Sequence, residues 1–219
     1  MTDTTGPVED TTGPPDDATG PVEDTPGGWP VASSVTQLKT WILTVRTDKV
    51  QMPDNEYAER TIVTHPGAVA VIALDDAGRV LMIRQYRHAA AAQLWEVPAG
   101  LRDVAGEPLL DTARRELLEE TGYQASDWHV LVDTYTSPGF TTERMRIFLA
   151  RGLQLAGESG YQREHEEKFL TAAWVPLADA VRLALDGKLH NGQAVTGVLA
   201  GHIASLNGFS GLRPGGAPE

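Results

Sequence analysis

The sequence predicts one domain of the α/β or α+β class, in which a mixed β-sheet packs between helices. Short apolar runs rich in β-branched residues recur along the chain and predict strands. Three longer stretches carry the start and stop signals of helices. After a leading segment with almost no apolar side chains, about 190 residues remain, which is enough for one hydrophobic core. Strands that interleave with few helices suggest this mixed arrangement.

The leading segment, residues 1–28, contains a repeat of seven residues. Its units are TGPVEDT at 5–11, TGPPDDA at 12–18 and TGPVEDT at 19–25. A period of seven would suit a coiled coil, but every unit contains Gly-Pro. This pair opposes a helix, because proline lacks the backbone donor and glycine costs entropy. We therefore expect an extended, self-repelling, disordered acidic tail, with a solubilising role favoured over docking to a partner.

Charge and composition exclude several classes of function. The net charge is −12, but seven acidic residues and no basic ones precede Trp29, so the rest of the chain carries only −5. Without a basic face we expect neither nucleic acid nor anionic membrane as a partner. The absence of cysteine excludes disulfides, thiolate zinc sites and cysteine nucleophiles. No signal-type leader and no apolar run of about 18 residues is present, so we expect a cytoplasmic protein.

The individual elements follow from local patterns. Apolar runs predict strands at 41–45, 60–64, 68–74 and 79–86, with Asp75, Asp76 and Gly78 as a hairpin turn. A helix is predicted over 109–121, since Pro108 suits its first turn and Gly122 ends it. Further strands are expected at 129–135, 146–150 and 171–175, and helices at 177–186 and 193–205. A flexible Gly/Pro-rich tail, residues 210–219, is expected to follow.

The helix at 109–121 has an acidic face. At 100° per residue Leu110, Ala113 and Leu117 share one stripe, and Glu116, Glu119 and Glu120 occupy a separate arc of about 100°. Like charges at this spacing repel, and Arg115 offsets only part of the repulsion through Glu119. Grouped carboxylates are hard oxygen ligands that suit Mg²⁺ or Mn²⁺. Taken alone, however, such a pattern is more often a solvated surface.

The surrounding sequence favours the metal site. The stretch GLRDVAGEPLLDTARRELLEETGY, residues 100–123, resembles the Nudix box, and eight residues match its signature: Glu107, Arg115, Glu116, Leu117, Glu119, Glu120, Gly122 and Tyr123. One departure is that six residues, instead of five, separate Gly100 from Glu107. This extra residue concerns the turn and the Ala99 carbonyl, and it shifts no carboxylate relative to another.

The resemblance implies the Nudix fold over about Gln37 to Phe209, with the hydrolase domain at 67–209. It further implies hydrolysis of a nucleoside diphosphate linked to another group. The implied cation, Mg²⁺ or Mn²⁺, is held by Glu116, Glu119, Glu120 and the Ala99 carbonyl. Four residues have structural roles in the motif, namely Gly100, Glu107, Arg115 and Gly122.

Flanking segments are similar to the ADP-ribose pyrophosphatase branch of that family. They are Pro138, fifteen residues past Tyr123, QYRH at 85–88 and WEVPAG at 95–100. In this branch an extra N-terminal antiparallel sheet, here residues 29–66, pairs two subunits, so a homodimer is expected. Substrate contacts are implied for Arg60, Arg87, Glu96, Pro138 and Gly139. Each arginine, taken singly, equally suits an exposed edge-strand position.

The branch has its catalytic glutamate in the loop at 163–168, where we choose Glu167 as general base and keep Glu166 in reserve. The acidic loop also suits a purely solvated role. The reaction expected is hydrolysis of ADP-ribose to AMP and ribose 5-phosphate. Other nucleoside diphosphate sugars are the nearest alternative substrates. A non-catalytic ADP-ribose sensor is a further alternative, against which the intact box argues.

Overall fold

The computed structural model describes residues 22–156 and 168–219, so Glu166 and Glu167 lie outside the described residues. In chain order the elements are β1 (Val31–Lys39), β2 (Thr44–Gln51), β3 (Tyr57–Thr64), β4 (Ala68–Ala73), β5 (Arg79–Arg87), η1 (His88–Ala90), β6 (Ala92–Glu96), β7 (Ala99–Leu101), α1 (Leu109–Thr121), β8 (Tyr123–Tyr135), β9 (Arg144–Leu155), β10 (Thr171–Pro176), α2 (Leu177–Leu185), α3 (Gly192–Leu206) and β11 (Arg213–Pro214).

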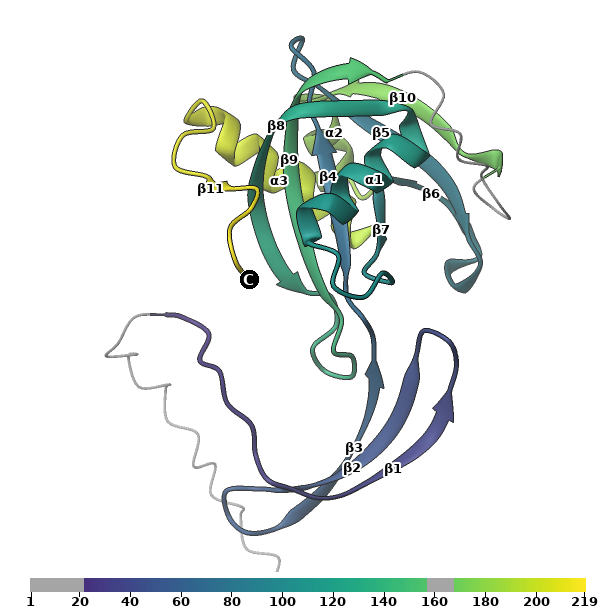
Figure 1. Ribbon diagram of the computed structural model, residues 1–219, viewed down its shortest axis with the longest axis vertical. Helices are drawn as coiled ribbons and strands as arrows, with labels where there is room; N and C mark the ends of the chain where they lie inside the picture. The colour runs from purple at the N-terminus through teal and green to yellow at the C-terminus, as the bar shows by residue number, and fades with distance from the viewer. Residues whose placement is uncertain (1–21, 157–167) are drawn as a thin grey trace, which may run out of the picture.

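A mixed sheet forms the centre of the molecule, as the sequence predicts. Its strand order is β11-β8-β9-β4-β7, and β4 runs parallel to β9 but antiparallel to β7. Every residue of β4 is buried, and its side chains alternate between two clusters. Val69 and Val71 pack with Leu117 of α1, while Ile72 packs with Val198 of α3. The sheet therefore lies between α1 and α3 (Figure 1), and a smaller antiparallel sheet, β10-β5-β6, adjoins it.

The first three strands form a separate antiparallel sheet that stands apart from the core (Figure 1). It is joined to the core where the Val63 amide donates to the Phe140 carbonyl and the Thr142 amide donates to the Val63 carbonyl. The strand predicted at 41–45 is largely wrong, because residues 41–43 form the turn between β1 and β2. β1 was not predicted, since all nine of its residues are exposed and its sequence has no apolar run.

The elements of the central domain agree more closely. The predicted helix 109–121 is found with the same bounds, and the two later helices differ by at most one residue at each end. β8 and β9 are longer than predicted, because their outer ends pair with each other and need no apolar run. No helix in the part of the chain that the structure describes is long and apolar enough to cross a membrane.

The expectation of a flexible tail at 210–219 differs from the structure. Arg213 and Pro214 pair with β8, and the Gly215 amide donates to the Trp128 carbonyl at 2.9 Å. The buried Arg146 of β9 donates to the Ala217 carbonyl at 2.7 Å. These polar anchors lie on β8 and β9, distant in sequence, so the tail's own Gly/Pro composition does not reveal them.

Candidate active site

The helix α1 places the carboxylates of Glu116 and Glu120 against β7. Pro108 precedes its first turn with φ −61°, and Gly122 ends it with φ 74°, in the left-handed region that favours glycine. Ala113 and Leu117 are fully buried under the sheet and fix the rotation of the helix. Glu116, Glu119 and Glu120 lie on a different face of the helix from Leu117. The packing of Leu117 therefore determines where these carboxylates lie.

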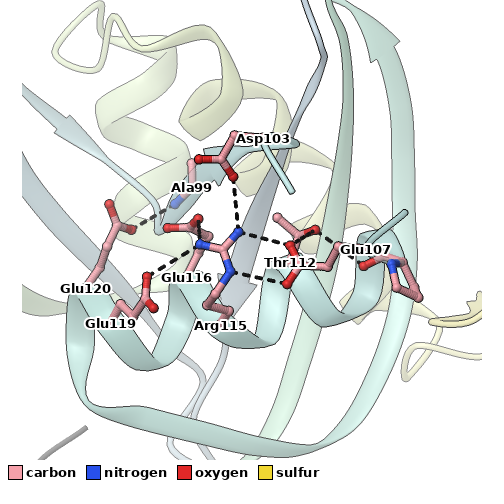
Figure 2. A network of polar contacts seen from close by, with 9 residues as sticks. Ala99, Asp103, Glu107, Thr112, Arg115, Glu116, Glu119 and Glu120 are labelled. Carbon is pink, nitrogen blue, oxygen red and sulfur yellow. Dashed lines mark hydrogen bonds and ion pairs between the residues drawn. The ribbon is translucent and has the colours of Figure 1, made fainter. Parts of the chain in front are cut away.

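Two close contacts join α1 to β7, and Figure 2 shows the one between Ala99 and Glu120. The Ala99 amide donates to Oε2 of Glu120 at 2.9 Å, and Glu120 is only 7% exposed. Glu116 lies directly against Gly100, where a Cβ atom would overlap with Cδ and Oε1 of the glutamate. Gly100 is therefore needed for close approach, and any side chain there would displace the Glu116 carboxylate.

Arg115 lies at the centre of the acidic cluster in Figure 2. Its guanidinium donates to Glu107 at 3.0 Å, to Glu116 at 2.6 Å and, as expected, to Glu119 at 3.5 Å. Asp103 forms a longer ion pair with it at 3.6 Å. The hydrogen bonds from Arg115 hold the pKa of Glu107 below its ordinary value despite burial, and the fully buried Thr112 hydroxyl contributes a further bond.

One guanidinium does not neutralise this cluster. Burial raises the pKa of Glu116 to about 7, and the repulsion from Glu119 adds to this effect although Arg115 opposes it. Within residues 22–156 and 168–219, no three acidic or histidine side chains already converge as a ready-made metal site. The carboxylates contact Arg115 and Ala99 instead.

The chemistry of the donor set nevertheless fits a hard divalent cation. It offers three carboxylates on successive turns of one helix, beside the backbone of Ala99, and excess negative charge that a cation would relieve. The residues available to hold it are Glu116, Glu119, Glu120 and the Ala99 carbonyl.

A cavity of about 340 Å³ opens on the other side of β7. It is lined by Arg87, Glu143, Asn191, Gln193, the three residues of β7, Ala68 and Met145. Arg87 is held by a two-pronged ion pair with Glu96, with contacts of 2.9 and 2.7 Å, and Glu96 is almost fully buried. The cavity therefore combines a fixed guanidinium with polar side chains, next to the strand that contacts the acidic helix.

The structure brings together most of the residues singled out from the sequence, but not all of them. Arg60 lies on β3 in the separate sheet, exposed, with its Nη1 donating to the Glu59 carbonyl. Pro138 and Gly139 lie in the turn between β8 and β9, next to the Phe140 carbonyl that bonds to β3. These three residues do not line the cavity beside β7.

Comparison with known proteins decides the family. The NUDIX domain model matches residues 64–196. The chain belongs to the Nudix family. ADP-ribose pyrophosphatase from Mycobacterium tuberculosis (strain ATCC 25618 / H37Rv) is 49% identical over 173 residues, which cover 79% of this chain and 82% of that protein. ADP-ribose pyrophosphatase from Bacillus subtilis (strain 168) is 39% identical over 143 residues, which cover 65% and 75%.

A solved structure shares the Nudix fold. A crystal structure of an ADP compounds hydrolase aligns with a TM-score of 0.69 over 86% of this chain and 99% of that chain. Its sequence identity is 21%, so the likeness concerns the fold alone.

The extra residue of this Nudix box lies in the loop between β7 and α1. Gly100 keeps its contact with Glu116, and α1 runs unbroken from Leu109 to Thr121. The additional length therefore lies in residues 102–108, where Gly106 has φ 78°.

The sequence reasoning missed Asp103, Thr112, Glu143 and Gln193, which touch this network or the cavity. Asn191, which also lines the cavity, was missed as well, although it has a local sequence signal: it is an N-cap residue before an apolar helix.

Proposed function

We propose that this protein hydrolyses the diphosphate of ADP-ribose to AMP and ribose 5-phosphate with Mg²⁺, or Mn²⁺, as its cation. One observation carries the proposal: an intact set of Nudix carboxylates on α1 lies across β7 from a polar cavity that contains Arg87. The two ADP-ribose pyrophosphatases, at 49% and 39% identity, support ADP-ribose as the substrate.

In this proposal Glu116, Glu119, Glu120 and the Ala99 carbonyl hold the cation. When bound, it lowers the pKa of the attacking water and neutralises charge on the diphosphate. Glu120 is oriented by the Ala99 amide, and Arg115 with Glu107 braces the helix against the loop. Because these contacts hold the helix in place, the carboxylates keep their positions when the negatively charged substrate binds.

Arg87 is proposed to bind the diphosphate. Its side chain is 45% exposed, while Glu96 holds one side of the guanidinium fork. Guanidinium groups suit phosphate oxygens because they donate in parallel pairs. The role of Glu96 is then to orient Arg87. Pro138 and Gly139 are proposed to contact the remainder of the substrate, as the resemblance implies.

Glu167 is proposed as the general base, with Glu166 in reserve. Glu167→Gln should lower kcat about 10²-fold or more and change KM little, because a base acts on the reacting water and not on ground-state binding. Glu166→Gln is the matched control. If the loss of kcat falls on Glu166→Gln instead, the assignment within this loop is wrong. Both residues lie outside the described part of the chain.

We also propose a homodimer formed through the sheet β1–β3. This sheet and its flanks expose large apolar side chains that a water-facing sheet does not require: Trp29, Val31, Val35, Leu38, Trp41 and Tyr57. Arg60 on the same sheet would then reach the substrate of the partner subunit. The cytoplasmic location expected from the sequence stays a prediction.

The test of the function is direct. The full chain is incubated with ADP-ribose and Mg²⁺, and AMP and ribose 5-phosphate are resolved by chromatography. Both products should appear in equal amounts, and EDTA should abolish their formation. Tight binding without turnover would support a sensor and defeat the proposal. A parallel panel of UDP-glucose and NADH measures specificity, and faster turnover of either one would favour the broader pyrophosphatase.

A further inference from the structure

The last described residues of the chain form a strap across the central sheet. This C-terminal strap, residues 213–219, begins where Arg213 and Pro214 pair with β8. At Gly215 the backbone packs so closely on the sheet that a Cβ atom would lie 2.9 Å from Cβ and 3.0 Å from O of Trp128, and 3.2 Å from Leu110 of α1. Gly216 has nothing within 4 Å of the same atom, so the close fit is confined to Gly215.

A buried arginine depends on the strap for its hydrogen bonds. Arg146 of β9 is 3% exposed and makes a two-pronged ion pair with Asp133 of β8, at 2.6 and 3.0 Å. Its remaining donors reach the Ala217 carbonyl at 2.7 Å and the Pro218 carbonyl at 3.0 Å. Because a buried guanidinium is costly unless its donors are satisfied, Arg146 holds the strap firmly in place.

The strap also contacts both ends of the loop that joins β7 to α1. At one end Oε1 of Glu219 pairs with Arg102 at 3.3 Å, and the Arg102 amide donates to the Gly67 carbonyl. At the other end Ala217 packs in the same cluster as Leu109 and Leu110, the first residues of α1. A cavity of about 220 Å³ lies between these two ends of the loop, and it is lined by residues 215–219 of the strap, Arg102, Arg146 and residues 107–110.

We propose, building on the cation site of the proposed function, that the C-terminal strap is a positioning element for that site. Ala99 contacts Glu120 and Gly100 contacts Glu116, so β7 and α1 must keep a fixed position relative to each other. Residues 102–108 form the loop that connects them. This loop contains no helix or strand, so by itself it does not fix β7 and α1 relative to each other. The strap limits their relative movement by fixing Arg102 and Leu110 from outside.

The test compares two valine substitutions in the full chain. Gly215→Val must lift the strap from Trp128 and Leu110, whereas Gly216→Val places the same side chain in open space. Mn²⁺ binding is measured by the loss of the free-ion EPR signal, without substrate. Gly215→Val should bind Mn²⁺ about tenfold more weakly, and Gly216→Val should match the wild type. Carboxypeptidase digestion checks that the strap is released in the first variant only.

A second variant tests the same proposal if Gly215→Val does not fold. Glu219→Gln removes the charge that faces Arg102 and should weaken Mn²⁺ binding by about threefold, the size expected of a partly exposed ion pair. The proposal is overturned if Gly215→Val releases the strap but still binds Mn²⁺ as tightly as the wild type. If Gly215→Val does not fold, wild-type Mn²⁺ affinity in Glu219→Gln overturns it. Since Mn²⁺ binding needs no substrate, a failure of ADP-ribose turnover is recorded separately and concerns only the proposed function.

Discussion

Glu120 is the most buried of the three glutamates on the acidic face of α1. Its carboxylate accepts a hydrogen bond from the Ala99 amide and is largely shielded from water. Glu120→Gln should keep this hydrogen bond but lose a charged ligand, and metal-dependent kcat should fall about 10²-fold or more. Asp111→Asn is the control, because Asp111 is an exposed residue of the same helix that pairs with Arg114. Equal activity of the two variants would refute the metal assignment.

Glu116 should make the stability of the metal-free protein depend on pH. Its pKa is raised to about 7 by burial, so the folded protein binds this proton more tightly than the unfolded chain does. The contribution to the free energy of unfolding is therefore complete below about pH 4.5 and is lost as the pH rises through about 7. Urea unfolding in EDTA between pH 5 and 8 should show a steeper loss for the wild type than for Glu116→Gln. Parallel curves would contradict the assignment.

Gly122 and Gly192 offer a test at the scale of single elements. Gly122 ends α1 with φ 74° and would place a Cβ no closer than 3.8 Å to its neighbours, so an alanine there meets conformational strain alone. Gly122→Ala should cost about 1–2 kcal/mol in the free energy of unfolding. Gly192, which opens α3, has no positive φ and open space around it. Gly192→Ala should instead stabilise by about 0.5–1 kcal/mol, and urea unfolding that gives both variants the same sign would contradict this account.

The elements that were predictable from the sequence are those whose signals are local. Pro108, the Leu117 stripe and Gly122 define α1 within one stretch of chain, and β4 is an uninterrupted apolar run. β1 has no such signal, since it is held by pairing with β2. β7 is only three residues long, and its place is set by contacts with β4 and α1.

The same distinction applies to the residues of the site. Glu116, Glu119 and Glu120 are neighbours in sequence, so their spacing predicts that they share a face. The ion pair of Arg87 with Glu96 depends on the register of β5 with β6, and the cavity gathers residues from 68 to 193. Contacts of this kind arise only when the sheet is assembled, and no local pattern encodes them.

At the scale of the whole molecule, the exposed apolar side chains of β1–β3 predict the state of association. Leu38 is 56% exposed, so Leu38→Lys should leave the chain folded but place a charge in the proposed interface. Sedimentation equilibrium should give a dimer for the wild type and a dissociation constant at least about tenfold higher for Leu38→Lys. Leu185→Lys, at an exposed position of α2, is the control and should remain dimeric. A monomeric wild type would defeat the interface.

The exposure of all nine residues of β1 has a consequence for how the protein unfolds. The apolar side chains of this strand, Val31, Val35 and Leu38, are more than half exposed, so in the proposed homodimer the strand would gain most of its burial from association, and the partner subunit would act as a stabilising ligand by mass action. The melting temperature should then rise with protein concentration, and dilution alone should loosen β1 before the central sheet opens. The amount of protein in solution would in this way decide whether Arg60 is available to a neighbouring subunit.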